Sequence, residues 1–292
     1  MYTHKLNRLG KNTVEIGIVI EKATIDQEYK ASFAKLLQNL EIKGFRRGKV
    51  PAKIAEQYLK KESIYEDVVK TIIPRIYEEI VKKDGLKPVM HPKIELAKAK
   101  ENEDWQIKIT LAEKPSVELG DFKETIRKIK AEQKKTDIWV PGKPGEKQEV
   151  SEKDKAKKQQ ELLNSILNAL LKETKCEISE LIIEEELNQR LSNLLTEIQK
   201  IGLTVDTYLK SKNLTQEELK KRYRNEIEQT YKLEFILGEL ADKENIKVEN
   251  SDIEKLLLSI NDPKERETAK ANSYFYASVL RKQKTLDYLL SI

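Results

Sequence analysis

The apolar residues of this chain follow two different periods along its length, and this change of period limits what the chain can fold into. Every second residue between positions 14 and 20 is apolar, namely Val14, Ile16, Ile18 and Ile20. This alternation predicts a strand with one buried face. From about residue 160 to the end, apolar residues instead recur every three to four positions, as on one face of a helix. The sequence therefore predicts an α+β N-terminal domain followed by an elongated all-α C-terminal domain, with helix as the main secondary structure.

The predicted α+β domain spans residues 1–115. Residues 105–111 alternate in the same way as the first strand and predict another one. Capping boxes at residues 24–27 and 63–66 are expected to start two helices, because a Thr or Ser side chain there can accept from the amide three residues later. Pro115 follows the second strand and is expected to close the domain.

Residues 116–160 contain few apolar side chains, and positions 141–145 read Pro-Gly-Lys-Pro-Gly, a cluster that breaks helices and strands. We expect a linker here, with Trp139 as its anchor. Residues 161–292 return to helical spacing and are expected to form the second domain. Within it, residues 215–218 form a capping box for a long helix.

Charge and composition exclude several classes of protein. The chain has 55 Lys and Arg against 50 Asp and Glu, a net charge of +5, which is too small to indicate a nucleic-acid partner by itself. The excess lies in residues 41–60, with six cations against two anions, and in residues 121–160, with twelve against eight. No stretch approaches the roughly 18 apolar residues of a membrane helix, and the N-terminus lacks the apolar segment of a secretory signal. With a single cysteine, the chain is expected to be cytoplasmic.

Residues that could carry catalysis are scarce. Cys176, His4 and His91 are far apart in the sequence, which argues against a zinc site of the Cys/His type. Cys176 has no neighbouring base and is expected to be a packing residue. The Gly-Lys pair at positions 48–49 lacks the Ser or Thr that completes a phosphate loop. We therefore expect no catalytic residue, no metal and no cofactor.

One segment combines residue types that are typical of a binding site. Residues 44–51 read Gly-Phe-Arg-Arg-Gly-Lys-Val-Pro, in which two glycines allow a tight loop that carries an aromatic ring and two guanidinium groups. Two interpretations remain open: the loop binds a partner, or its phenylalanine packs between helices while the cations solvate the turn. In the first case the binding residues are Gly44, Phe45, Arg46, Arg47, Gly48, Lys49 and Pro51.

This segment matches the signature Gly-Phe-Arg-x-Gly-x-x-Pro of the trigger factor family, the ribosome-associated chaperones of bacteria. Residues 113–119 and 215–219 also resemble the family, and the resemblance covers nearly the whole chain. It implies an N-terminal ribosome-binding domain in which Phe45, Arg46 and Arg47 dock onto protein and RNA of the large ribosomal subunit at the tunnel exit. It further implies a C-terminal substrate-binding domain for nascent or unfolded polypeptides, no use of ATP, and homodimers away from the ribosome.

The chain departs from the family pattern in its middle. Most members carry a peptidyl-prolyl isomerase domain of FK506-binding type between these two parts, whereas here only residues 116–160 occupy that place. An isomerase of this type needs an aromatic-lined pocket on a sheet, and this stretch offers Phe122 and Trp139 as its only aromatic residues. We therefore predict that the isomerase domain is missing and that the chain is not an enzyme.

The resemblance also implies that the helical domain forms a cradle with exposed apolar side chains. An apolar stripe on a helix more often faces a core than a partner, so packing between helices remains the alternative for each residue. The candidate substrate-binding residues are Leu194, Ile198, Leu203, Tyr208 and Phe235.

Two other functions fit parts of the sequence. An RNA-binding or ribosome-assembly factor could use the same basic loop at residues 44–51, and it would bind free RNA with a steep dependence on salt. A divergent prolyl isomerase would catalyse refolding that is limited by proline isomerisation. We take the ribosome-docked chaperone as the main hypothesis.

Overall fold

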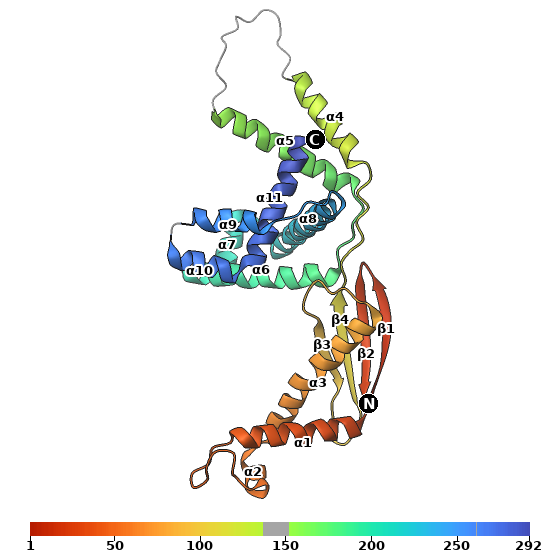
Figure 1. Ribbon diagram of the computed structural model, residues 1–292, viewed down its shortest axis with the longest axis vertical. Coiled ribbons are helices and arrows are strands. Elements are labelled where there is room, and N and C mark those ends of the chain that lie inside the picture. Colours follow the sequence, from red (N-terminus) through yellow and green to blue (C-terminus); the bar gives the residue numbers. More distant parts are fainter. Residues whose placement is uncertain (137–151, 261) are drawn as a thin grey trace, which may run out of the picture. The chain divides into compact units, whose positions relative to one another are not determined.

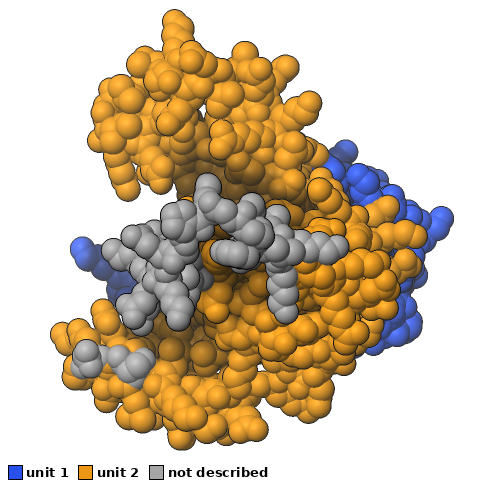
Figure 2. Space-filling view, turned by 90° about the horizontal axis from the view of Figure 1, so that it is seen from above, with its two compact units in different colours: residues 1–114, 179–182 blue, residues 115–178, 183–292 orange. Residues whose placement is uncertain are grey.

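The computed structural model describes residues 1–136, 152–260 and 262–292 (Figure 1). The chain forms two compact units, which Figure 2 shows in different colours. Unit 1 contains residues 1–114 and 179–182, and unit 2 contains residues 115–178 and 183–292. Among the described helices, none combines the length and apolar content that crossing a membrane requires. The predicted order, an α+β part followed by helices, is confirmed.

Unit 1 is built on a four-stranded antiparallel sheet with the strand order β1-β2-β4-β3. The strands are β1 (Tyr2–Gly10), β2 (Thr13–Ile20), β3 (Lys93–Lys98) and β4 (Trp105–Ala112). The alternation at residues 14–20 is confirmed as β2, and its four apolar side chains are buried. The sequence pattern does not predict strand β1, because its apolar side chains are few: Tyr2 and Leu6 are half-buried at the edge of the sheet and Leu9 is exposed.

Three helices accompany this sheet: α1 (Lys22–Asn39), α2 (Ala52–Tyr58) and α3 (Lys61–Asp84). Helix α3 packs against the sheet through one apolar stripe and ends at Gly85, whose positive φ of 65° is the left-handed conformation expected of a glycine cap. The buried residues of the stripe are Ile64, Val68, Ile72, Ile73, Ile76 and Ile80. All of them except Ile64 form one core with the apolar side chains of β2 and β4.

The two capping boxes predicted for unit 1 are wrong. Helix α1 begins at Lys22 and α3 at Lys61, so the side chains of Thr24 and Ser63 lie inside the helices rather than at their caps. The hydroxyl of Thr24 instead donates to the carbonyl oxygen of Met1 at 3.2 Å and accepts from the N-terminal amine. A tertiary contact with the first residue of the chain has therefore replaced the local cap.

The regular elements of unit 2, among its described residues, are helices. Its helices are α4 (Phe122–Thr136), α5 (Glu152–Glu173), α6 (Glu180–Lys200), α7 (Val205–Lys212), α8 (Gln216–Lys243), α9 (Asn250–Ser259), α10 (Pro263–Ala271) and α11 (Ser273–Ser291). The capping box at residues 215–218 is confirmed: Thr215 Oγ1 accepts from the amide of Glu218 at 3.2 Å, and the Glu218 carboxylate accepts from the amide of Thr215 at 2.8 Å.

The structure differs from the expected linker at residues 116–160. Helix α4 occupies part of that stretch, and Leu119, Phe122 and Ile126 are buried in a core with side chains of α5, α8 and α11. Within α4, Phe122, Ile126 and Ile129 are spaced three to four residues apart, which is enough for one apolar face of a short helix between many charges. Trp139 and the Pro-Gly cluster at residues 141–145 lie outside the described residues.

Polar side chains join helices α4, α8 and α11 beside this core. The ammonium of Lys123 lies 2.9 Å from a carboxylate oxygen of Glu244, and the hydroxyl of Tyr288 donates to the same carboxylate. These hydrogen bonds, first from Tyr288 and then from Lys123, lower the pKa of Glu244. Lys130 donates to the carbonyl oxygen of Leu290 at 2.6 Å. The C-terminal helix is thus tied to residues that the sequence assigned to a linker.

Candidate functional site

Residues 40–51 connect α1 to α2 and carry the motif found in the sequence. Two tight turns shape this loop. In the first, the amide of Phe45 donates to the carbonyl oxygen of Ile42 at 3.0 Å, and in the second, the amide of Lys49 donates to the carbonyl oxygen of Arg46 at 2.9 Å. Val50 is buried and precedes Pro51, which takes the N-cap position of α2. The loop is therefore held at its end, while its middle extends into solvent.

Both glycines of the loop have positive φ angles, 93° at Gly44 and 72° at Gly48. At Gly48 a Cβ atom would lie 3.0 Å from the carbonyl oxygen of Gln38, which belongs to the last turn of α1. At Gly44 no atom lies within 4 Å of the Cβ position, so only its φ angle favours glycine. Glycine at position 48 thus lets the loop pass close to the backbone of α1.

The loop presents an aromatic ring together with positive charge. Phe45 is 40% exposed, so its ring is accessible to a partner rather than enclosed between helices. Arg47 donates to the side-chain oxygen of Asn39 at 3.0 Å and lies 3.7 Å from the carboxylate of Glu41. Arg46 is exposed, and across residues 1–136, 152–260 and 262–292 its guanidinium has no hydrogen bond or ion pair. One guanidinium is thus held in place and the other is free to reach a carboxylate or phosphate.

Outside this loop, the described residues of the two units offer little for chemistry. Over the part of the chain that the structure describes, no three His, Cys, Asp or Glu side chains are grouped so that they could hold a metal ion. The thiol of Cys176 is buried, and burial raises its pKa, which makes it a poor nucleophile at neutral pH.

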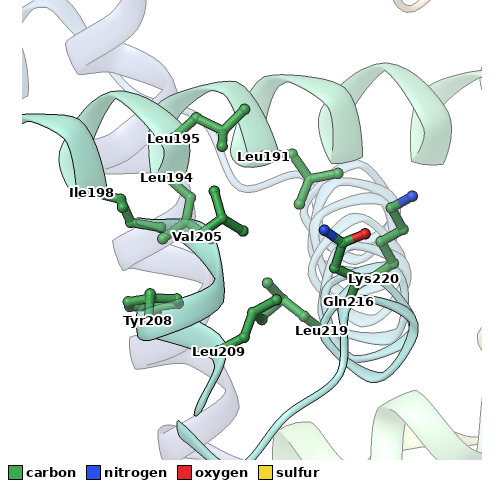
Figure 3. Close-up of a pocket in the computed structure, with 10 residues that line it drawn as sticks. All are labelled: Leu191, Leu194, Leu195, Ile198, Val205, Tyr208, Leu209, Gln216, Leu219 and Lys220. Atoms are coloured by element: carbon green, nitrogen blue, oxygen red, sulfur yellow. The ribbon is translucent and has the colours of Figure 1, made fainter. Parts of the chain in front are cut away.

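A second candidate site is an apolar pocket in unit 2 with a volume of about 160 Å³ (Figure 3). It lies between α6, α7 and the start of α8, because α6 ends before Gly202 and Thr204 caps α7 by accepting from the amide of Thr207 at 3.2 Å. The lining residues are Leu191, Leu194, Leu195, Ile198, Val205, Tyr208, Leu209, Gln216, Leu219 and Lys220. The lining is mostly aliphatic, with two polar side chains from α8.

The structure brings together three of the five candidate substrate-binding residues. Leu194, Ile198 and Tyr208 point into this pocket (Figure 3). Leu203 is exposed but is not part of the lining, and Phe235 is half-buried farther along α8. The pocket residues are close because the chain turns at residues 201–204 between α6 and α7, so that side chains of both helices line one pocket, which the helical spacing alone does not reveal.

Sequence reasoning missed a second group of exposed apolar side chains in unit 2. Leu258 on α9 is 71% exposed, and on α11 Tyr274 and Phe275 are 89% and 61% exposed. A signal was present in the sequence, since three consecutive aromatic residues at positions 274–276 cannot all lie on one buried face of a helix. Large apolar side chains exposed in this way are typical of surfaces that bind other polypeptides.

Comparison with known proteins links both units to one family. The family model described as bacterial trigger factor protein matches residues 2–139, and the model of the trigger factor C-terminus matches residues 146–290. The trigger factor of Pelotomaculum thermopropionicum is 34% identical over 117 residues, which are 40% of this chain and 27% of that protein. The trigger factor of Enterococcus faecalis is 34% identical over 119 residues, 41% of this chain and 28% of that protein. The chain thus spans about a quarter of the length of these curated relatives.

A solved structure has a fold similar to that of this chain. It comes from a study of promiscuous substrate recognition in folding and assembly by the trigger factor chaperone. The two structures superpose with a TM-score of 0.60 at 15% sequence identity, covering 98% of this chain and 99% of the other. The solved structure shows a similar fold, and the two family models, which together match both units, lead to one conclusion: the chain belongs to the trigger factor family.

Proposed function

We propose that the chain is an ATP-independent molecular chaperone that docks at the ribosomal tunnel exit and shields nascent polypeptides during folding. The observation that carries this proposal is the loop at residues 44–51, which matches the family's docking signature and exposes Phe45 beside two guanidinium groups. The proposal places the chain in the cytoplasm, where translating ribosomes are found. It includes homodimers away from the ribosome, which sedimentation at several protein concentrations would detect.

Docking in this proposal combines an apolar and an electrostatic contact. The ring of Phe45 enters an apolar depression of ribosomal protein, which removes its exposed surface from water. Arg46 pairs with a phosphate of ribosomal RNA or with a carboxylate, and Arg47 does so after leaving its contacts with Asn39 and Glu41. Because phosphate contacts release counterions, binding weakens as the salt concentration rises.

Unit 2 supplies the contacts with unfolded polypeptides. Its pocket between α6, α7 and α8 accepts an apolar side chain, while exposed groups such as Tyr274 and Phe275 offer further apolar contacts. Contacts of this kind are non-directional, so they tolerate many sequences and release the polypeptide without an energy source. Support for this role comes from the apolar lining of the pocket and from the exposure of these aromatic rings.

We also propose that the chain does not catalyse prolyl isomerisation. The stretch at residues 116–160 is short, and helix α4, which it contains, contributes Phe122 to the core of unit 2 rather than to an aromatic pocket on a sheet. The test is the refolding of a protein whose slow phase is limited by proline isomerisation. An accelerated slow phase in the presence of this chain would overturn the proposal.

The deciding experiment for docking is co-sedimentation with large ribosomal subunits at low and high salt. The wild type is compared with Phe45→Ala/Arg46→Ala/Arg47→Ala and with a matched control that also loses one exposed apolar residue and two exposed cations of unit 1, Leu9→Ala/Lys82→Ala/Lys83→Ala. We expect the wild type and the control to pellet with the subunits at low salt, and the loop variant to stay in the supernatant. Equal pelleting of all three proteins contradicts the proposal, and tight binding of wild type to free RNA favours the RNA-binding alternative.

A further inference from the structure

The sheet of unit 1 has one strand whose inner face lacks a helix to cover it. In the ladder between β3 and β4, Ile94 lies opposite Ile109 and Leu96 lies opposite Ile107. Residues that are directly opposite each other share a face, so all four side chains lie on the same face of the sheet. Ile107 and Ile109 are buried in the core with α3. Ile94 and Leu96, by contrast, are 44% and 47% exposed. Helix α3 therefore covers β2 and β4 and leaves the inner face of β3 open.

An apolar groove occupies this open face. It has a volume of about 400 Å³ and runs between the flank of α3, with Tyr65 and Val69, and the segment that follows Leu96 up to Trp105. The groove is preformed, because the ring of Tyr65 packs at 5.8 Å from that of Trp105, whose indole N–H donates to the carbonyl oxygen of Lys100 at 3.2 Å. A preformed apolar groove binds without the cost of ordering its own side chains.

The rim of the groove is acidic. Three carboxylates line it, those of Glu62, Glu66 and Glu101, against the single ammonium of Lys70. Glu101 lies 3.0 Å from Lys61 and Glu66 lies 3.9 Å from Lys70, so these two ammonium groups offset two of the three carboxylates and leave one net negative charge at the rim. The Glu62 side chain forms no ion pair with any described residue. The rim therefore favours a ligand with positive charge.

Strand β3 is also an edge of the sheet, since the strand order ends with it. Its ladder with β4 uses one side of its backbone, which leaves the other side available for an additional strand. Charges lie on its outer face, where Lys93 pairs with Glu95 at 3.0 Å. The inner face carries Ile94 and Leu96, so an added strand would meet an apolar surface on that side.

We propose that β3 accepts an extended polypeptide segment as a fifth strand of the sheet. Backbone hydrogen bonds to β3 hold the segment, its inward-facing apolar side chains fill the groove beside α3, and Lys or Arg residues at its ends contact the acidic rim. This is strand addition to an exposed edge, in which the main chain supplies affinity and the groove supplies selectivity. The inference does not rest on the proposed function, because it uses neither the loop at residues 44–51 nor the pocket in unit 2.

The test uses Trp105 as an internal reporter. The chain has two tryptophans, so the variant Trp139→Phe leaves Trp105 as the only one, and its fluorescence is followed while a peptide is added. The probe is the synthetic peptide Lys-Lys-Val-Thr-Phe-Thr-Val-Lys-Lys. Two control peptides replace its four lysines by Glu or carry N-methyl groups on alternate backbone amides, which removes the donors that a β-ladder needs.

We expect saturable binding of the lysine peptide. Both control peptides are expected to bind more weakly, by a factor of about ten or more. In the same Trp139→Phe background, Leu96→Asp is expected to weaken binding by about tenfold or more, because it places a charge in the apolar groove. The matched control Leu9→Asp makes the same change at an exposed leucine of β1, at the other edge of the sheet, and should leave the affinity unchanged. Circular dichroism and thermal unfolding verify that each variant is folded.

Several outcomes would overturn the proposal. If the N-methylated peptide binds as tightly as the parent, the edge of β3 is not used, and if Leu96→Asp binds as tightly as its background, the groove is not used. A concentration-dependent dimer that disappears in Leu96→Asp would show that a second copy of this chain occupies β3 instead. The variant Phe45→Ala/Arg46→Ala/Arg47→Ala should still bind the peptide, which separates this result from failure of ribosome docking.

Discussion

The loop at residues 44–51 permits a numerical prediction for the variant Phe45→Ala. A phenylalanine side chain can bury roughly 200 Å², and Phe45 is 40% exposed in the free chain. Docking can therefore remove about 80 Å² of apolar surface from water, which at about 25 cal/mol per Å² corresponds to about 2 kcal/mol. Because about 1.4 kcal/mol is a factor of ten in affinity, we expect Phe45→Ala to weaken ribosome binding about 30-fold.

The assay is a titration of large ribosomal subunits against chain labelled with a fluorophore in unit 2, read by anisotropy at fixed salt. Part of the ring is already buried, so Phe45→Ala also removes some packing within unit 1. Thermal unfolding of each variant separates this loss from the loss of binding. Leu9→Ala, which shortens an exposed apolar residue elsewhere in unit 1, is the control and should bind like the wild type.

The conservative variant Phe45→Leu gives an intermediate result if the reasoning is correct, because leucine retains part of the apolar surface. A dissociation constant that stays within about twofold of the wild type for Phe45→Ala, with unit 1 still folded, would refute the apolar contact. The salt dependence of binding would then be the only remaining signature of docking.

Three further predictions follow from particular contacts. Arg46, which has no partner among the described residues, should contribute more to salt dependence than Arg47, so Arg46→Ala is expected to reduce the slope of log Kd against log salt by about one and Arg47→Ala by less. Leu195→Asp places a charge in the apolar pocket of unit 2 and should therefore weaken the binding of unfolded polypeptides. In a light-scattering assay with a chemically denatured test protein, about threefold more of this variant than of the wild type, or still more, should be needed to suppress aggregation. Hydrogen bonds from Tyr288 and a lysine lower the pKa of Glu244 below its ordinary value of 4.5, so its stabilising effect is complete at neutral pH and is lost as the pH falls through the lowered pKa. Glu244→Gln should therefore lower the urea midpoint clearly at pH 7 and less at pH 3.

Local patterns in the sequence correctly predicted those elements whose structure is decided by residues only a few positions apart. The alternation at residues 14–20 became β2, and the capping box at residues 215–218 starts α8 as expected. In both cases the residues that decide the structure are neighbours in the chain, so the relevant contacts are visible without the fold. The same holds for the motif at residues 44–51, whose two glycines adopt the positive φ angles that a tight loop requires.

Predictions failed where residues outside a segment decide the structure of that segment. Strand β1 forms because β2 supplies a partner for its backbone, although its own apolar residues are few. Helix α4 is stable because α5, α8 and α11 cover its short apolar stripe, which in isolation reads as a polar segment. Thr24 resembles an N-cap, yet its hydroxyl contacts Met1 instead. Propensity is a weak signal in each case, and tertiary contacts override it.

The sequence by itself determined the period of each segment, the composition of the loop at residues 44–51 and, through that loop, the family. Only the tertiary structure decided which apolar side chains remain accessible. Leu96 and Ile107 both follow the alternation of a strand, but α3 covers the second and not the first. Leu194 and Tyr208 line a common pocket because α6 and α7 pack together. The physical reason is that burial depends on two surfaces meeting, and a sequence pattern describes only one of them.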